Sequence, residues 1–378
     1  MSNAKIVRVE WATLTGKRPR PAGENARIGK HGEVLHLPVV RLSDSEGHKG
    51  FGYCYCGAEA AKLLGLHVED LIDAGAGVLE QGRIVESSLW DLLGHRTSQP
   101  VYKLAAAING LNTPGRLRVP CYDTSLYFDD LQLSSTSEAA ALMVDEAMQG
   151  YAKGHRAFKI KVGRGARWLP LLEGTERDIA IIRAVRRAVG PDCKVLIDAN
   201  NGYNLNIAKR VLTETADCNV YWIEEAFHED DSFYGDLKKW MRDRSISTLV
   251  ADGEGLASPE LINWAGRGLV DVIQYDIFGH GFTHWLQTGK QLDELGAMSA
   301  PHAYGNHLAN FVSAHLSTAI KHYTLLEWDE AQTEGLDTSA YSIVNGHLEV
   351  PDSPGFGLCL DEDLFTTTAQ LNGGSLSL

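Results

Sequence analysis

From about Leu117 onward, short apolar runs alternate with helical stretches over roughly two hundred residues. The runs predict strands at Arg118–Thr124, Ala157–Val162, Lys194–Ile197, Val220–Ile223, Ser247–Ala251, Val270–Tyr275, Ala297–Pro301 and Thr324–Leu326. Between them lie helical patterns such as Glu176–Val189, in which apolar residues recur along one stripe. Eight strands with intervening helices close a β/α barrel. The alternation therefore predicts an α/β fold built on a TIM-type (β/α)7β barrel.

The residues before this alternation have a different pattern, in which strands come first and helices follow. Strands are predicted at Lys5–Leu14 and in a hairpin of Val34–Leu42 with Lys49–Cys56, and helices around Val68–Gln81, Ile84–Leu93 and Pro100–Ala107. This order indicates a small α+β capping domain. We expect the capping domain at 1–116, the barrel at 117–335, and a segment at 336–378 that completes the capping domain and contains a hairpin at Tyr341–Val350.

Composition limits the partners that such a chain can have. The net charge is −14, whereas a nucleic-acid-binding surface needs a basic face, so no nucleic acid is expected. There is no apolar run long enough to span a membrane, and Met1–Glu10 lacks the apolar core of a signal peptide, so we expect a cytoplasmic protein with no membrane association. The cysteines form no pair of CxxC motifs and are expected to be buried, reduced thiols.

Polar side chains follow the predicted barrel strands in a regular register. In chain order they are Lys159, Lys161, Asp198, Glu224, Glu254, Asp276, His302 and Glu327. The steps from Lys161 onward are 37, 26, 30, 22, 26 and 25 residues, close to one β/α unit each. One acidic residue after a strand is usually a helix cap, but the repetition in phase is not explained by capping. Because the carboxyl ends of barrel strands form one face, these side chains are predicted to converge.

Three of these residues have the chemistry of a metal site. Asp198, Glu224 and Glu254 offer carboxylates from three adjacent strands. Hard oxygen ligands of this kind suit Mg²⁺ rather than zinc. A zinc hydrolase on the same barrel is an alternative, disfavoured because all three expected ligands are carboxylates.

The remaining residues of the set can act as acids and bases. Lys159 and Lys161 are two apart on one strand, so both point the same way, and a divalent cation beside them would disfavour the charged form of a lysine base. Asp276 and His302 end neighbouring strands, where a hydrogen bond would orient the ring and stabilise its protonated form. A carboxylate on the metal would lose its α-proton to either side, giving an enediolate stabilised by the cation and by Lys159. Glu327, if protonated, could donate a hydrogen bond to the other carboxylate oxygen.

Short motifs occur in a fixed order along nearly the whole chain. They are SLWDLLG at 88–94, FKIKVG at 158–163, LIDAN at 196–200, WIEE at 222–225, GEG at 253–255, YDIFGHG at 275–281, PHAYGNHLANFVSAHL at 301–316 and LLEW at 325–328. Together they resemble the enolase superfamily and, within it, the mandelate racemase subgroup. The resemblance implies a Lys or His base with Mg²⁺ stabilising an enediolate. It implies the same ligands, the same bases and the same hydrogen-bond donor as the residues themselves suggest.

The chain departs from the pattern of that family at three positions. Ala226 stands where the family often has proline after the paired glutamates, and His280 interrupts what is commonly a pair of glycines. Asp252 occupies a position that is usually small, so it is a further candidate ligand that would compete with Glu254 or support it. None of these changes removes a predicted catalytic group.

The enediolate has three possible fates. Reprotonation on the other face makes a racemase or epimerase, ring chemistry on a lactone or anhydro-sugar acid makes a cycloisomerase, and loss of a β-hydroxyl with His302 as general acid makes a dehydratase. We predict the last, a hydro-lyase that converts an aldonate or aldarate into a 2-keto-3-deoxy acid. A non-catalytic binding protein that kept the barrel is the alternative from another class, although no member of the catalytic set is missing.

The substrate preference rests on the segment Lys17–Glu33, which is rich in cationic side chains. A cationic cap over the barrel mouth suits an anionic polyol better than an aromatic acid, unless these side chains are merely solvated. The candidate substrate-binding residues are Arg18, Arg20, Arg27, Tyr122 and Asn200. The expected partners are a small-molecule carboxylate substrate and further copies of the chain in a homo-oligomer.

Overall fold

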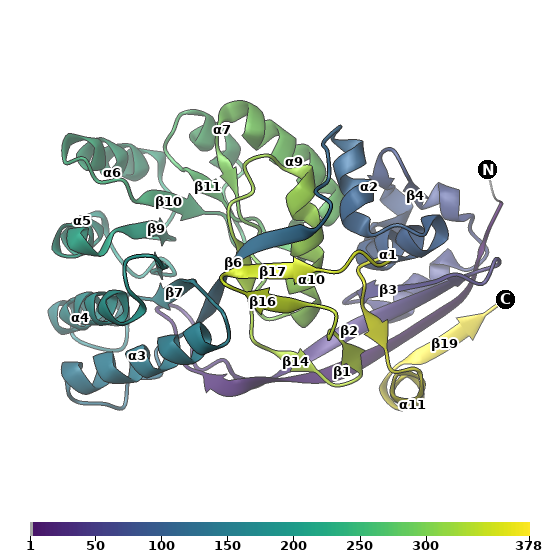
Figure 1. The fold of residues 1–378 in the computed structure, drawn as a ribbon, viewed down its shortest axis with the longest axis horizontal. Helices are drawn as coiled ribbons and strands as arrows, with labels where there is room; N and C mark the ends of the chain where they lie inside the picture. The colour runs from purple at the N-terminus through teal and green to yellow at the C-terminus, as the bar shows by residue number, and fades with distance from the viewer. Residues whose placement is uncertain (1–2) are drawn as a thin grey trace.

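The computed structural model describes residues 3–378. Two parts lie side by side in Figure 1: a barrel surrounded by helices, and a strand-rich part that carries both chain termini. Within the described residues, the barrel strands are β6 (Leu117–Leu126), β7 (Ala157–Lys161), β8 (Lys194–Asp198), β9 (Val220–Glu224), β10 (Leu249–Asp252), β11 (Val272–Ile273), β12 (Met298–Ser299) and β13 (Leu326–Trp328).

These strands form a closed parallel barrel. From β6 to β12 each strand pairs in parallel with the next one along the chain, and β13 pairs in parallel with β6, where Glu327 lies opposite Tyr122. A parallel bridge from Ser299 to Tyr323 joins β12 to the residues just before β13. The predicted TIM-type barrel is therefore confirmed, with shorter sixth and seventh strands than the apolar runs suggested.

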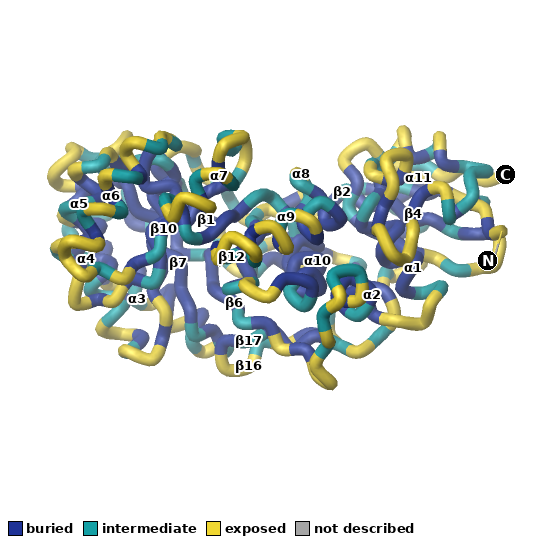
Figure 2. Tube along the Cα trace, turned by 90° about the horizontal axis from the view of Figure 1, so that it is seen from above, coloured by how far each residue is buried: buried dark blue, intermediate teal, exposed yellow. Residues whose placement is uncertain are grey.

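Helices lie outside the barrel and connect its strands (Figure 1). They are α3 (Thr136–Ala152), α4 (Leu171–Val189), α5 (Leu205–Glu214), α6 (Asp231–Asp243), α7 (Leu261–Gly266), α8 (Ile277–His280), α9 (Phe282–Leu295) and α10 (His307–Leu316). Several begin at a polar cap: the side chains of Ser135, Asn204 and Asp230 each accept a backbone N–H of the first turn, which satisfies donors that have no partner in the helix. Figure 2 shows exposed stretches on these helices around a buried interior.

The alternation of side chains along each strand decides what faces the barrel interior. Ala157 on β7 belongs to the apolar cluster inside the barrel, together with Leu196 and Trp222 on the next strands. Because residues two apart share a face, Lys159 and Lys161 point inward too, towards the carboxyl ends of the strands. Ile160, the residue between them, packs outward against the helices and is fully buried.

The strand-rich part is an antiparallel ribbon covered by helices. Its elements are β1 (Ile6–Ala22), β2 (Gly32–Asp44), β3 (Lys49–Tyr53), α1 (Glu86–Thr97) and α2 (Val101–Ile108). The strand β1 is longer than predicted because its pairing with β2 continues to Ala22, opposite Gly32. Helix α1 lies very close to β3, and a Cβ atom at Gly50 would come within 2.3 Å of the backbone nitrogen of Leu92.

The helix predicted at Val68–Gln81 is wrong. The structure has a 3-10 turn at Val68–Asp70, two short paired strands β4 (Ile72–Asp73) and β5 (Gly77–Val78), and a 3-10 helix at Glu80–Val85. Gly77 adopts a φ of 88°, in the left-handed region that favours glycine and breaks a helix. The apolar spacing was therefore not sufficient where glycines interrupted it.

The chain after the barrel returns to the first part, as Figure 1 shows. Its elements are β14 (Gln332–Thr333), β15 (Leu336–Asp337), β16 (Ser342–Val344), β17 (His347–Val350), β18 (Cys359–Leu360), α11 (Glu362–Asn372) and β19 (Gly374–Ser377). Both β14 and β19 pair with β1, whereas the hairpin of β16 and β17 extends β6 of the barrel. Because this segment joins both parts, the limits 1–116, 117–335 and 336–378 stay a prediction.

Two expectations from composition can be compared with the described residues. None of the helices in residues 3–378 is long and apolar enough to cross a membrane. The cysteines are free, and four are buried, whereas Cys56 and Cys359 are exposed, so burial holds for only part of the set.

Candidate active site

The structure brings the eight polar residues of the strand register together at the carboxyl ends of the barrel strands. Asp198 ends β8 and Glu224 ends β9, while Glu254 lies two residues beyond β10. Each ends a different strand, and neighbouring strands pair in parallel, so residues 22 to 37 positions apart in the chain become neighbours in space.

Three of these side chains form a carboxylate group that could hold a metal ion. Asp198, Glu224 and Glu254 each place one oxygen within 4.8 Å of the oxygens of the others. The Oε2 atom of Glu254 is buried and accepts no hydrogen bond from any residue in the described range 3–378. Burial and the charge of Asp198 raise the pKa of Glu224 to about 8. Crowded carboxylates, one with a buried oxygen that accepts no hydrogen bond, fit a hard divalent cation, which would relieve their mutual repulsion.

The barrel itself orients two of the three carboxylates. The backbone N–H of Asn200 donates to Oδ1 of Asp198 at 2.9 Å. The indole N–H of Trp222 and the amide of Gln274 donate to Oε2 of Glu224 at 3.1 and 3.0 Å. Such donors fix the direction of a carboxylate before a metal binds to it.

Both lysines lie directly on these acids. Nζ of Lys159 is 2.7 Å from Oε1 of Glu224 and 2.9 Å from Oε1 of Glu327, and Nζ of Lys161 donates to Asp198. Burial opposes their charge, but the carboxylates prevail and raise the pKa of both amines. These neighbours alone favour protonated lysines, so the lowered pKa expected for a base requires the added charge of a divalent cation.

His302 and Asp276 form the predicted pair. Nδ1 of the imidazole lies 2.5 Å from Oδ1 of Asp276, and Nε2 lies 3.3 Å from Oε2 of Glu254 and 3.7 Å from Oε2 of Glu327. Burial opposes the charged ring, but Glu254, Glu327 and Asp276 together raise the pKa of His302 to about 10. The imidazole is therefore held as a proton donor with Nε2 directed into the site.

Glu327 is held by three donors. Its Oε1 accepts from the hydroxyl of Thr124 at 2.8 Å, its Oε2 accepts from the backbone N–H of Ala303 at 2.8 Å, and Lys159 lies beside it. Burial opposes ionisation, but Lys159 and His302 lower the pKa of this carboxyl. These contacts favour the ionised carboxylate, so the hydrogen-bond donor role suggested from the sequence would require a proton that these neighbours disfavour.

The arginines of the predicted cationic cap are paired with acids of the barrel. Arg18 forms two hydrogen bonds to Asp329, of 3.1 and 2.7 Å. Arg20 contacts Ser125 and Glu146 instead, so the structure does not bring it to the carboxylate group. Arg27 lies 3.4 Å from Glu225 and 3.2 Å from Glu254. Their charges hold the cap against the barrel, which leaves less positive charge for a substrate than the sequence suggested.

Tyr122 and Asn200 lie beneath the mouth rather than in it. Tyr122 is fully buried inside the barrel, with its ring 5.3 Å from that of Trp222 and 5.2 Å from Nζ of Lys159. Asn200 is 2% exposed, and its side-chain amide donates to Oε2 of Glu225 at 2.9 Å. Both support the residues that line the mouth.

None of the three positions that depart from the family pattern is part of the carboxylate group. Asp252 accepts a hydrogen bond from the hydroxyl of Tyr234 on α6 and another from the N–H of Gly253, so its carboxylate is turned to the helix layer. The ring of His280 bonds Thr288 at 2.8 Å, and burial lowers its pKa to about 4. Ala226 is buried.

Sequence reasoning missed an aromatic group beside Lys161. Tyr127 and Tyr304 stack with ring centres 5.2 Å apart, and Nζ of Lys161 lies 5.3 Å from the ring of Tyr127. His31, from the loop between β1 and β2, packs edge-on against both rings, and burial with the charges of Lys161 and Arg18 lowers its pKa to about 4. The only sequence signal was the place of Tyr304, two residues after His302.

A cavity of about 400 Å³ lies next to the His302 pair. Its walls come from both parts of the molecule, with Asp276, His302 and Tyr304 on the barrel side and His36, Tyr53 and Tyr55 on the strand-rich side. A space of this size, walled by polar and aromatic groups, fits a small polar molecule.

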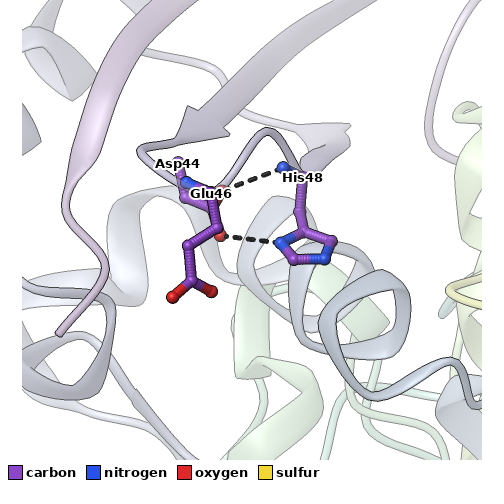
Figure 3. Close-up of side chains that lie close together, drawn as sticks. All are labelled: Asp44, Glu46 and His48. Atoms are coloured by element: carbon purple, nitrogen blue, oxygen red, sulfur yellow. Dashed lines mark hydrogen bonds and ion pairs between the residues drawn. The ribbon is translucent and has the colours of Figure 1, made fainter. Parts of the chain in front are cut away.

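A second acidic group lies in the turn between β2 and β3, shown in Figure 3. Oδ1 of Asp44 accepts the backbone N–H groups of Glu46 and His48 at 2.9 Å each. Its Oδ2 lies 3.2 Å from Nδ1 of His48 and 2.6 Å from Arg96. These bonds explain the group as a hydrogen-bonded turn closed by an arginine.

The sequence profile of the enolase C-terminal domain-like family matches residues 142–364, which is more than half of the chain. The chain belongs to this family. Galacturonate dehydratase from Geobacillus sp., in a crystal structure with D-galacturonate and 5-keto-4-deoxy-D-galacturonate, is 49% identical, with a TM-score of 0.94 and 99% of each chain covered. A magnesium complex of a mutant of that enzyme is 48% identical, with a TM-score of 0.97, and covers 100% of this chain and 98% of that one.

More distant members of the enolase family are also dehydratases. Arabinonate dehydratase from Saccharolobus solfataricus is 25% identical over 289 residues, which cover 74% of this chain and 70% of that protein. Two cycloisomerases and an epimerase occur among relatives of similar identity. The chain is therefore similar to enzymes with each of the three outcomes considered from the sequence, and the structures of galacturonate dehydratase resemble it over nearly its whole length.

Proposed function

We propose that the chain is a Mg²⁺-dependent dehydratase of a hydroxylated sugar acid, and that D-galacturonate is its substrate. The observation that carries this proposal is the similarity over 99% of the chain to galacturonate dehydratase, in a protein whose carboxylates, lysines and His302 pair converge at one mouth. A 5-keto-4-deoxy acid has its keto group beside the carboxylate. Counted from the carboxylate, it is a 2-keto-3-deoxy acid, the type of product predicted from the sequence, although D-galacturonate is a uronate and not one of the aldonates or aldarates named there.

The roles of the site residues follow from their contacts. Asp198, Glu224 and Glu254 would hold Mg²⁺, which supplies positive charge to the substrate carboxylate when it is bound. Lys159, fully buried between Glu224 and Glu327, would neutralise charge that develops on that carboxylate. Because Lys159 has no exposure to solvent, water screens its charge little, and its electrostatic interaction with the substrate is stronger than it would be at the surface.

Two acid/base groups flank the three carboxylates from opposite ends. Lys161 forms an ion pair with Asp198, and His302 forms one with Glu254. In the proposed reaction, the neutral amine of Lys161 takes the proton from the carbon next to the carboxylate. The Nε2–H of His302 gives its proton to the hydroxyl on the following carbon, which leaves as water while the C–O bond breaks. The resulting enol then gains a proton on the carbon that lost the hydroxyl and releases its O–H proton, which gives the keto acid.

Asp276 would keep His302 in the form that this step needs. Its bond to Nδ1 leaves the proton on Nε2 facing the site, and the surrounding carboxylates keep the ring protonated near neutral pH. Glu327 fixes the backbone beside His302 through the N–H of Ala303.

Proton NMR in D₂O, with Mg²⁺ and D-galacturonate, tests the proposal. We expect the substrate signals to fall and the signals of a deoxy methylene group to appear. Loss of the proton beside the carboxylate without a methylene product would instead indicate an epimerase. Turnover of a galactaro-lactone or an anhydro-sugar acid would indicate a cycloisomerase. No reaction with D-galacturonate would contradict the proposed substrate, and no reaction with any uronate, aldonate or aldarate would contradict the dehydratase itself. His302→Gln provides the inactive control.

Location and assembly belong to the same proposal. The free cysteines of the described chain suit a reducing compartment, which supports a cytoplasmic location. A homo-oligomer is proposed as well, and exposed apolar side chains, including Leu172 at 62% and Leu256 at 106% of full exposure, are available for contacts with a second copy. Light scattering after size exclusion gives the mass, and a monomer at micromolar concentration would contradict the homo-oligomer.

A further inference from the structure

The loop that follows His302 is held by two acids from the end of β13. The backbone N–H of Ala303 donates to Oε2 of Glu327 at 2.8 Å, and the N–H of Gly305 donates to Oδ2 of Asp329 at 3.1 Å. The two acceptors are two residues apart, and so are the two donors. Two bonds in the same register fix both the position and the direction of the loop that begins at His302.

Asp329 is in turn bound by an arginine from the strand-rich part. Nε and Nη2 of Arg18, on β1, donate to Oδ1 and Oδ2 of Asp329 at 3.1 and 2.7 Å. The two side chains are 8% and 2% exposed. The same carboxylate also accepts the N–H groups of Gly305 and Ala331. One buried side chain therefore joins β1, the His302 loop and the chain after Glu327.

Arg18 also contacts the His302 loop directly. Its guanidinium carbon lies 4.5 Å from the ring centre of Tyr304, which stands between the two residues whose N–H groups are held. The same ring also contacts Tyr127, with ring centres 5.2 Å apart. Tyr304 thus contacts both a cation of the strand-rich part and a ring of the barrel.

We propose that Arg18 is a positioning residue. Through Asp329, it makes the position of His302 depend on how the strand-rich part packs against the barrel. The sequence suggested a substrate contact, but Nε and Nη2 of Arg18 are used by Asp329. Without Arg18, Asp329 is a buried carboxylate without its cation, and it no longer holds Gly305 in one place. A displacement of about 1 Å of an acid/base group can reduce a rate about 100-fold. The effect on rate rests on the proposed dehydratase function, whereas the effect on the position of His302 does not.

The first experiment compares Arg18→Ala and Arg18→Lys with Arg41→Ala. Arg41 is a matched control because it is 6% exposed and pairs with Glu10 and Glu362 at 2.9 and 2.6 Å, within the strand-rich part and its C-terminal helix. We expect kcat for dehydration to fall about 10- to 100-fold in Arg18→Ala. We expect a smaller loss in Arg18→Lys, because an ammonium keeps the charge but not both bonds. Arg41→Ala should keep the wild-type kcat at temperatures where it is folded.

Two kinetic readouts separate positioning from substrate binding and from simple loss of stability. If Arg18 positions His302, KM changes less than threefold while kcat falls. Deuterium from D₂O should then enter the carbon next to the carboxylate in recovered substrate, because Lys161 still exchanges that proton while the step at His302 is slow. A rise in KM at unchanged kcat would overturn the proposal, because it would make Arg18 a substrate contact.

The second experiment needs no substrate and observes His302 itself. In protein with ¹³C-labelled histidine, the ring signal of His302 is the one that is absent in His302→Gln. We expect it to shift or divide in Arg18→Ala and Arg18→Lys and to stay in place in Arg41→Ala. An unmoved signal in both Arg18 variants overturns the proposal. A wild-type protein that dehydrates no sugar acid would contradict only the proposed function, since the NMR comparison still decides the coupling.

A third variant covers the case in which Arg18→Ala does not fold. The double change Arg18→Met with Asp329→Asn removes both charges, so no unpaired buried charge remains. An amide at 329 still has an oxygen that can accept the N–H of Gly305, but the tie to β1 is lost. We expect the His302 signal to move and kcat to fall at least about 10-fold. A folded double variant with wild-type signal and kcat would overturn the proposal.

Discussion

Oδ1 of Asp276 lies 2.5 Å from Nδ1 of His302, so the other ring nitrogen of His302 faces Oε2 of Glu254 at 3.3 Å. The same pair forms a parallel bridge between the ends of two neighbouring barrel strands. Backbone pairing therefore sets the distance between the two residues before their side chains meet. This arrangement makes the orientation of the imidazole depend on a residue that need not touch the substrate.

Asp276→Asn tests that dependence. The amide keeps the size of the side chain but stabilises a charged ring less well, so we expect kcat for dehydration to fall about 100-fold or more. The melting temperature should change little, because the side chain of Asp276 is 33% exposed. Steady-state kinetics on D-galacturonate measure the loss. Activity equal to the wild type would show that His302 needs no such partner.

The stability of the metal-free protein should fall as pH rises above neutrality. His302 has a folded pKa of about 10 against an ordinary value of 6.5. A raised folded pKa gives stability that is complete below pH 6.5 and is lost as pH rises towards 10, because the unfolded ring has already released its proton. Urea unfolding in EDTA at pH 7 and pH 9.5 measures the effect. His302→Gln should show a smaller loss between these two values, and an equal loss would contradict the assignment.

The three clustered carboxylates should decide the affinity for Mg²⁺. We expect Glu254→Gln to weaken binding at least about 10-fold, because the buried Oε2 that it alters is a predicted metal ligand. Asp252→Asn is the neighbouring control, since Asp252 bonds Tyr234 and is not part of the cluster. Calorimetric titration with Mg²⁺ compares the two. Equal weakening in both variants would point to general charge rather than to ligation.

The packing of helix α1 against strand β3 should be sensitive to a single methyl group added at Gly50. In Gly50→Ala, the new Cβ would lie 2.3 Å from the backbone nitrogen of Leu92, where no flexible side chain can yield. We expect a loss of about 1–3 kcal/mol in the free energy of unfolding, or more. Gly115→Ala is the control, because its Cβ meets nothing within 4 Å, and it should stay within about 0.5 kcal/mol. Urea unfolding of both variants measures the difference.

The barrel and its central residues could be predicted because they follow from local periodicity. Alternation along β7 puts Lys159 and Lys161 on one face, and the repeat of one strand and one helix brings Asp198 and Glu224 beside them. The helix predicted at Val68–Gln81 was wrong because local periodicity alone was used there too. An apolar spacing typical of a helix was present there, but the conformation of Gly77 outweighed it.

The role of the cap could not be predicted, because it depends on contacts between residues that are far apart in the chain. Arg18 meets Asp329 at a separation of 311 residues, and Arg27 meets Glu254 at 227. A run of cations in sequence shows its charge but not its partners. Because Arg18 and Arg27 pair with acids of the barrel, they hold the two parts together and do not form the expected surface for anions.

The sequence by itself determined the barrel, the order of its strands and the set of residues at its mouth, because a period of two along strands and a repeat of one β/α unit are local properties of the chain. Only the tertiary structure decided the charge states and the directions of these residues. Lys159 and Glu327 are buried, His302 lies half-buried beside them, and the pKa of each depends on the charges that folding brings within a few ångströms. Coulomb interactions in a buried site depend on distance in space, which the order of residues in the chain does not contain.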